Sequence, residues 1–174
     1  MPDNTYFGDF VYINNIIDAL GNLYQKDYPL IADGRRTHEQ TVSFRIAMYL
    51  AKQLESLNNQ LYVDCEYHGD KNRQDMRKFV NGEYIRPDII YHNRDEQNEF
   101  CIEMKIGSMT RHDYEKINHL ISEYGYREGY CISNIGKKFV TIDTVSSQQR
   151  TWKRYRFKYD SNDKKLELKN AGEI

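Results

Sequence analysis

Several features that mark common protein classes are missing from this sequence of 174 residues. It has three cysteines and no CxxC pair, so no zinc ribbon is indicated and the thiols are expected to be reduced. No apolar run approaches the ~20 residues needed to span a bilayer. The first residues, MPDNTYFGDF, contain no basic segment followed by an apolar one, so we expect no signal peptide. These absences predict a cytoplasmic protein that does not enter a membrane.

The motifs of several enzyme classes are also missing. No glycine-rich phosphate loop occurs, and Ser108 and Ser133 lack the flanking glycines of a serine-hydrolase elbow. The histidines fit no zinc spacing, since His112 and His119 are two helical turns apart and too distant to share a metal. A serine hydrolase and a zinc enzyme are therefore not supported.

Net charge is close to zero as well. The 25 Lys and Arg residues are balanced by 26 Asp and Glu residues, which gives −1 at pH 7. This balance argues against a protein held to nucleic acid by overall charge, although it allows a local basic face. What the chain has in abundance is aromatic bulk, with seven Phe and fifteen Tyr. That bulk supports a folded chain, and the length fits a single domain over residues 1–174.

Apolar periodicity predicts an α/β protein with a mixed central sheet flanked by helices. Thr37 and Gln40 form a capping box at the start of one helix, and another helix is expected to begin at a cap of Thr110 or Ser108 and to end at Gly125. The predicted helices cover residues 10–24, 37–57 and 111–124, and the predicted strands cover 61–67, 86–92, 100–106, 129–133, 139–142, 152–159 and 166–168. A polar stretch over 68–84 separates the first two strands, and a turn-rich loop joins the next two into an antiparallel hairpin.

Three charged residues of this hairpin suggest chemistry. Asp88 follows Pro87 at the head of one strand, while Glu103 and Lys105 share one face of the next. Two carboxylates one strand apart form a site for a hard divalent cation, and an ammonium beside them can position an attacking water. Phosphodiester hydrolysis needs this set. The simpler alternatives are that Asp88 opens a turn and that Glu103 and Lys105 form a solvated ion pair.

Pro87-Asp88 followed by Glu103-Met104-Lys105 resembles the motif of the PD-(D/E)XK nuclease superfamily, which has the restriction-endonuclease-like fold. The core of that fold has the order αβββαβ, and the elements predicted over about 37–135 follow the same order. The N-terminal helix, about 10–24, and a strand extension over about 138–169 lie outside the resemblance. The chain is also similar to uncharacterised bacterial proteins with the pattern E…DCEY…PDII…ExK.

The resemblance implies a nuclease that uses Mg²⁺ or Mn²⁺, with DNA ahead of RNA as substrate, in defence or DNA processing. Asp88 and Glu103 would hold the metal together with the Met104 backbone carbonyl, and Lys105 would position the water. The alternative is a non-catalytic module of the same fold that binds nucleic acid or a partner protein.

Glu39 adds to the resemblance. On a helical wheel it lies about 20° from both Ile46 and Leu50, so it points with the apolar stripe. A carboxylate there is costly unless it faces a cation or a donor. The resemblance implies that Glu39 reaches the metal site, whereas a carboxylate stabilised by the helix dipole is the simpler alternative.

Two further carboxylates, Asp64 and Glu66, share one face of the strand predicted over 61–67. By the same resemblance, either one would add a metal ligand or orient Lys105.

Two basic segments, 71–78 and 150–158, stand out from the neutral average. In the second, alternation places Trp152, Arg154, Arg156 and Lys158 on one face, which suits phosphate contacts and base stacking. The alternative is an edge strand protected by charge. The predicted nucleic-acid contacts are Arg35, Arg36, Lys71, Arg73, Arg77, Lys78, Arg154, Arg156 and Lys158. The net charge near zero is then the sum of an acidic cluster and two basic segments. It suggests that tight binding of nucleic acid requires a homodimer or a partner protein.

Overall fold

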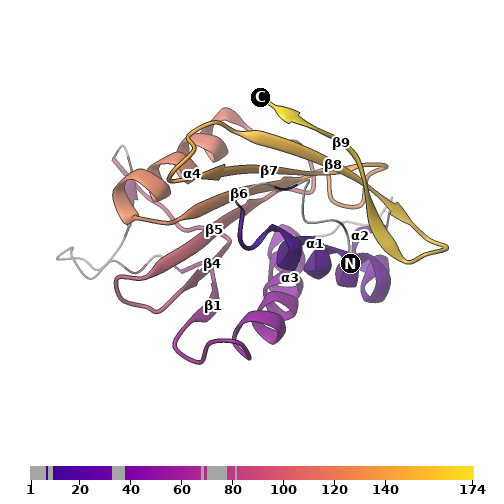
Figure 1. Ribbon diagram of the computed structural model, residues 1–174, viewed down its shortest axis with the longest axis horizontal. Coiled ribbons are helices and arrows are strands. Elements are labelled where there is room, and N and C mark those ends of the chain that lie inside the picture. The colour runs from indigo at the N-terminus through magenta and orange to yellow at the C-terminus, as the bar shows by residue number, and fades with distance from the viewer. Residues whose placement is uncertain (1–6, 8–9, 33–37, 68, 70–77, 81) are drawn as a thin grey trace.

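The computed structural model describes residues 7, 10–32, 38–67, 69, 78–80 and 82–174 (Figure 1). These residues form an α/β fold with a seven-stranded mixed sheet, which confirms the prediction of an α/β protein with a mixed central sheet flanked by helices. The helices are α1 (Ile13–Lys26), α2 (Tyr28–Ile31), α3 (Glu39–Leu54) and α4 (Arg111–Tyr124). The sheet has the order β1 (Tyr62–Cys65), β4 (Ile89–His92), β5 (Asn98–Met104), β6 (Glu128–Ser133), β7 (Val140–Ser146), β8 (Lys153–Asp160) and β9 (Lys165–Glu173).

The centre of the sheet combines a hairpin with a crossover. β4 and β5 pair antiparallel with Ile89 opposite Ile102, as the turn-rich loop between them predicts. β5 and β6 run parallel, and α4 provides the long connection that a parallel pair requires. Because their carboxyl ends point the same way, the residues that follow β5 and β6 meet at one edge of the sheet.

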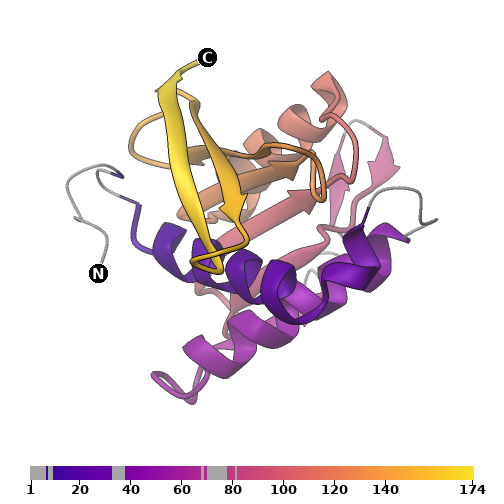
Figure 2. The ribbon, with the colours of Figure 1, turned by 90° about the vertical axis from the view of Figure 1, so that its right-hand side faces the viewer.

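The helices cover both faces of the sheet (Figures 1 and 2). α1 and α3 pack on one face, where Ile46 of α3 and Ile102 of β5 belong to the same apolar cluster. α4 covers the other face, where Ile117 packs in a second cluster with Cys101 and Cys131. The alternation of β5 therefore divides its side chains between two layers. No helix in the described part of the chain is both long enough and apolar enough to cross a membrane.

Local signals predicted α4 well. Thr110 and Asp113 form a capping box, and Gly125 ends the helix in the left-handed region at φ +70°. In α3 the N-cap residue is His38, which makes no side-chain cap hydrogen bond, and the predicted cap Thr37 lies outside the described residues. The three C-terminal strands predicted over 139–168 are present: β7 and β9 are longer than predicted, and β8 is shifted by one residue.

Two predictions about the first strands are wrong. The stretch predicted as a polar connection contains a short hairpin of β2 (Phe79–Val80) and β3 (Glu83–Tyr84). β1 ends at Cys65, because Glu66 adopts a positive φ of 49°. That turn breaks the strand alternation, so Asp64 and Glu66 do not share a face.

Candidate active site

The β4–β5 hairpin brings the two halves of the PD…ExK motif together. The Asp88 N–H donates to the Ile102 carbonyl at 3.1 Å, which extends the pairing of the two strands to Asp88. The Asp88 carboxylate, through Oδ2, accepts the Met104 N–H at 2.7 Å. The backbone beside Glu103 therefore orients the Asp88 side chain toward the end of β5.

Glu103 is a buried carboxylate with a raised pKa. Its side chain faces α4, where Lys116 Nζ lies 2.5 Å from Glu103 Oε1. Burial and the nearby charge of Asp88 raise the pKa of Glu103 to about 7, and Lys116 opposes the rise. Lys116 also donates to the Arg86 carbonyl at 2.7 Å. Glu103 Oε1 is fully buried, and Lys116 is the cation that offsets its charge.

The pKa of Asp88 is raised as well. Burial is the main cause, the hydrogen bond from Met104 opposes it, and the charge of Glu39 adds to it. Two neighbouring carboxylates that both resist ionisation are a place where a bound divalent cation would be stabilising. With the Met104 carbonyl, they offer the oxygen ligands that Mg²⁺ and Mn²⁺ prefer. The residues present therefore fit such a metal.

Lys105 is held by Glu39. Lys105 Nζ donates to Glu39 Oε2 at 3.1 Å, and the Lys105 N–H donates to the Ile132 carbonyl at 2.9 Å. Burial would lower the pKa of Lys105, but the hydrogen bond and the charge of Glu39 outweigh it and raise the pKa. Glu39 thus has the cation that its position required. Its side chain is 45% exposed, so its burial was overestimated.

Glu66 and Asp64 lie in different places. Glu66 Oε1 accepts from Gln40 Nε2 at 2.9 Å, which places Glu66 beside the first turn of α3 that carries Glu39. Asp64 is bound by Arg94, with contacts of 2.8 Å to both its oxygens, and by His92 at 2.9 Å. Asp64 is therefore engaged elsewhere, and Glu66 is the member of the pair that lies near the site.

Two of the predicted nucleic-acid contacts are engaged in the fold. Lys78 is 4% exposed and donates to the Gly69 carbonyl at 2.5 Å. Arg154 forms a bidentate pair with the buried Asp143, with distances of 2.7 and 2.8 Å. Burial of Asp143 demands this partner, so neither Lys78 nor Arg154 is available as predicted.

The rest of the predicted basic face is partly retained. Arg156 and Lys158 are exposed on β8, as the alternation of the strand predicts. Trp152 packs edge-on against Tyr114 at 5.0 Å between ring centroids, so it is less available for stacking than predicted. The remaining predicted contacts lie outside the described residues: Arg35, Arg36, Lys71, Arg73 and Arg77.

Sequence reasoning missed Lys116 and Gln40. Gln40 follows Glu39 directly on α3, so it could have been expected near the site. Its contact there is the hydrogen bond that it donates to Glu66. Lys116 is an ordinary polar residue of α4, between Glu115 and Ile117, and no local pattern distinguishes it. Its contact with Glu103 arises only because α4 crosses over the end of β5.

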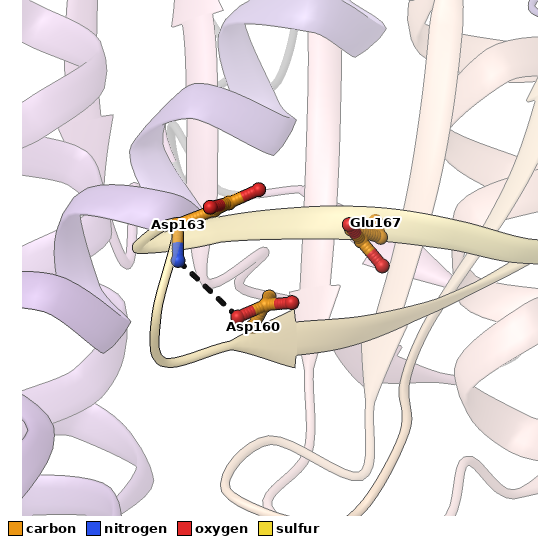
Figure 3. Close-up of side chains that lie close together, drawn as sticks. All are labelled: Asp160, Asp163 and Glu167. Atoms are coloured by element: carbon orange, nitrogen blue, oxygen red, sulfur yellow. Dashed lines mark hydrogen bonds between the residues drawn. The ribbon is translucent and has the colours of Figure 1, made fainter.

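A separate acidic group lies at the turn between β8 and β9 (Figure 3). Asp160, Asp163 and Glu167 each place a carboxylate oxygen within 4.8 Å of the others. Asp160 Oδ1 accepts the N–H of Asp163 at 3.2 Å, which is an ordinary turn contact. Lys165 lies 3.0 Å from Asp163 and offsets the charge. Exposed groups of this kind are common without an ion, so this one does not indicate a metal site.

Searches against protein-family models, curated proteins and solved structures find no match for this chain. The function of this chain is therefore inferred from the arrangement of its own residues.

Proposed function

We propose that this protein is a Mg²⁺- or Mn²⁺-dependent nuclease of the PD-(D/E)XK type, with DNA as the preferred substrate. One observation carries the proposal: the Asp88 carboxylate accepts the N–H of Met104, the residue between Glu103 and Lys105, at 2.7 Å. Asp88 therefore lies at the end of β5, where its charge adds to the raised pKa of Glu103 and the charge of Lys105 opposes the rise in the pKa of Asp88. The order α3-β1-β4-β5-α4-β6 supports a restriction-endonuclease-like core, interrupted by the small β2–β3 hairpin.

Each residue has a role in this reaction. Asp88, Glu103 and the Met104 carbonyl would hold the metal, which when bound polarises the phosphate and lowers the pKa of water. Lys105 orients the attacking water and offsets charge on the phosphate oxygens. Glu39 positions Lys105 through their 3.1 Å hydrogen bond. Lys116 contacts Glu103, and its hydrogen bond to the Arg86 carbonyl would keep its ammonium satisfied if Glu103 held a metal.

The test uses purified protein with plasmid and single-stranded DNA and RNA in Mg²⁺ or Mn²⁺. Asp88→Ala and Lys105→Ala should each lower the cleavage rate by about 100-fold or more, the usual effect of losing a group that acts in the transition state. Asp64→Asn is the matched control, because Asp64 lies in the neighbouring strand but is bound by Arg94 and His92. Equal cleavage by wild type, Asp88→Ala and Lys105→Ala would refute the assignment.

A second candidate is a non-catalytic module that binds nucleic acid or a partner protein. It is favoured by the pairing of the site's charges among themselves, with Lys105 on Glu39 and Lys116 on Glu103. Calorimetric titration with Mn²⁺ separates the two candidates. Heat of binding that Asp88→Ala abolishes supports the nuclease, whereas no binding with or without nucleic acid supports the module.

A further inference from the structure

A cavity of about 580 Å³ opens where the end of α1, the start of α2, the β6–β7 loop and the end of β8 meet. Three tyrosines and three lysines line it: Tyr24, Tyr28, Tyr159, Lys137, Lys138 and Lys158. Among the described residues that line it there is no carboxylate. By contrast, the cavity between α1 and β9 carries Asp18 and Glu167 beside its lysines. The tyrosine–lysine cavity therefore combines positive charge with aromatic surface.

This cavity and the candidate active site share one edge of the sheet. Asn134, at the start of the β6–β7 loop, donates its N–H to the carbonyl of Gly107 at 2.9 Å. Gly107 lies two residues beyond Lys105, so the loop begins beside the segment that carries the candidate lysine. Tyr24 then accepts the N–H of Gly136 at 2.8 Å, which ties the same loop to α1. A strand of nucleic acid lying along this edge would meet both places.

The wall of the cavity is fixed by packing and by close backbone contacts. Tyr24 is 4% exposed and its ring lies 5.1 Å from that of Tyr159, beside the β8–β9 turn that descends toward α1 (Figure 2). Gly136 has φ +79°, and a Cβ there would lie 2.1 Å from the Ile31 carbonyl oxygen. Only glycine allows this approach of the loop to α2. The aromatic floor is thus held in place from two sides.

The exposed groups at the rim are the ones that could contact a ligand. Tyr28 is 49% exposed at the start of α2, and Lys138 and Lys158 are exposed on the loop and on β8. The carboxylate of Asp160, close to Lys158 in sequence, accepts the N–H of Asn162 at 2.8 Å. An aromatic ring beside two ammonium groups is the arrangement that binds a base by stacking and its phosphates by charge.

We propose that this cavity binds one unstacked nucleotide of a single-stranded segment that runs from the candidate active site. The base lies against Tyr28, and the flanking phosphates contact Lys138 and Lys158. The volume lies within the range of about 300–1,000 Å³ typical of small-molecule sites. A base can enter such a cavity only when it is not stacked in a duplex, so the site selects single strands. This inference rests on the proposed nuclease function, whose substrate it specifies.

The test measures fluorescence anisotropy of a labelled oligothymidine of about 12 nucleotides, a length within known single-strand site sizes, in EDTA so that nothing is cut. Tyr28→Ala should weaken binding about fivefold or more, whereas Tyr28→Phe keeps the ring and the affinity of wild type. The double variant Lys138→Gln, Lys158→Gln should reduce the slope of log K against log salt by about 1.4. Lys52→Gln, at the exposed far end of α3, is the matched charge control and should leave the slope within about 0.3 of wild type.

Several results would overturn the proposal. These are no binding by wild type at low salt, equal binding by wild type and Tyr28→Ala, or equal competition by polyglutamate, which would show that charge alone is recognised. A duplex of the same length should bind more weakly and should not respond to Tyr28→Ala.

The same titration with Asp88→Ala separates this proposal from the nuclease itself. Asp88→Ala should lose cleavage and keep the binding that depends on Tyr28. If wild type binds with this dependence on Tyr28 but cuts no substrate in Mg²⁺ or Mn²⁺, the cavity is supported and the nuclease is contradicted. Cleavage by wild type without any dependence of binding on Tyr28 overturns the cavity alone.

Discussion

The raised pKa of Glu103 makes a quantitative prediction about stability. The folded protein keeps this carboxyl protonated up to a pKa of about 7, whereas its ordinary value is 4.5. Between these values the folded state binds more protons than the unfolded state, so the free energy of unfolding falls as pH rises. The contribution is fully present below about pH 4.5 and is lost above about pH 7. Glu103→Gln replaces the carboxylate by a neutral amide and removes this titration.

The expected magnitude follows from the shift. At 1.36 kcal/mol per unit, the rise from 4.5 to about 7 corresponds to about 3 kcal/mol. The side chain is 4% exposed, so screening by solvent reduces this little. The attraction of Lys116 is already included in the pKa of about 7, so it needs no separate correction. We therefore expect the free energy of unfolding of Glu103→Gln, relative to that of wild type, to increase by about 2–3 kcal/mol as the pH rises from 5 to 8.

Urea unfolding in EDTA at pH 5, 6, 7 and 8 measures this difference, with equal m-values as the check on two-state behaviour. Glu115→Gln on the exposed side of α4 is the control, and it should parallel wild type. A stability difference between Glu103→Gln and wild type that stays constant across this range would refute the reasoning. The same variant should have no nuclease activity, so stability at pH 8 and activity should change in opposite directions.

Three other variants test the contacts around the site. Lys116→Met should raise the pKa of Glu103 further and cost about 3 kcal/mol at pH 8 but less at pH 5, as measured by urea unfolding at both values. Arg154→Ala should cost about 3–5 kcal/mol in the same assay, because it leaves Asp143 buried without its bidentate partner; a loss under about 1 kcal/mol would contradict that account. Gly136→Ala should lower the melting temperature by several degrees and weaken oligonucleotide binding, since its positive φ and the Ile31 carbonyl leave no room for a Cβ.

Sequence patterns predicted those parts of the protein whose cause is local. The capping box of Thr110 with Asp113 and the left-handed Gly125 define both ends of α4 within a few residues. The alternation of β8 buries Tyr155 and Phe157 and exposes Arg156, because each strand residue points opposite to the next. The pairing of Asp88 with the end of β5 followed from a short turn-rich loop, which joins adjacent strands.

The partners of charged side chains depended on tertiary structure. Glu66 left the face of Asp64 because of a single positive φ, which no residue pattern in β1 predicts. Arg154 is unavailable for a phosphate contact because β7 places Asp143 opposite it in the sheet, and the two side chains pair. Lys116 reached Glu103 because the β5–β6 crossover lays α4 over the end of the hairpin. The sequence by itself determined the main helices and the antiparallel pairing of the PD…ExK hairpin, through short-range periodicity and turns, but not the β2–β3 hairpin. Which cation meets which buried carboxylate was decided only when distant elements packed, because burial makes an ionised group require a partner wherever the fold supplies one.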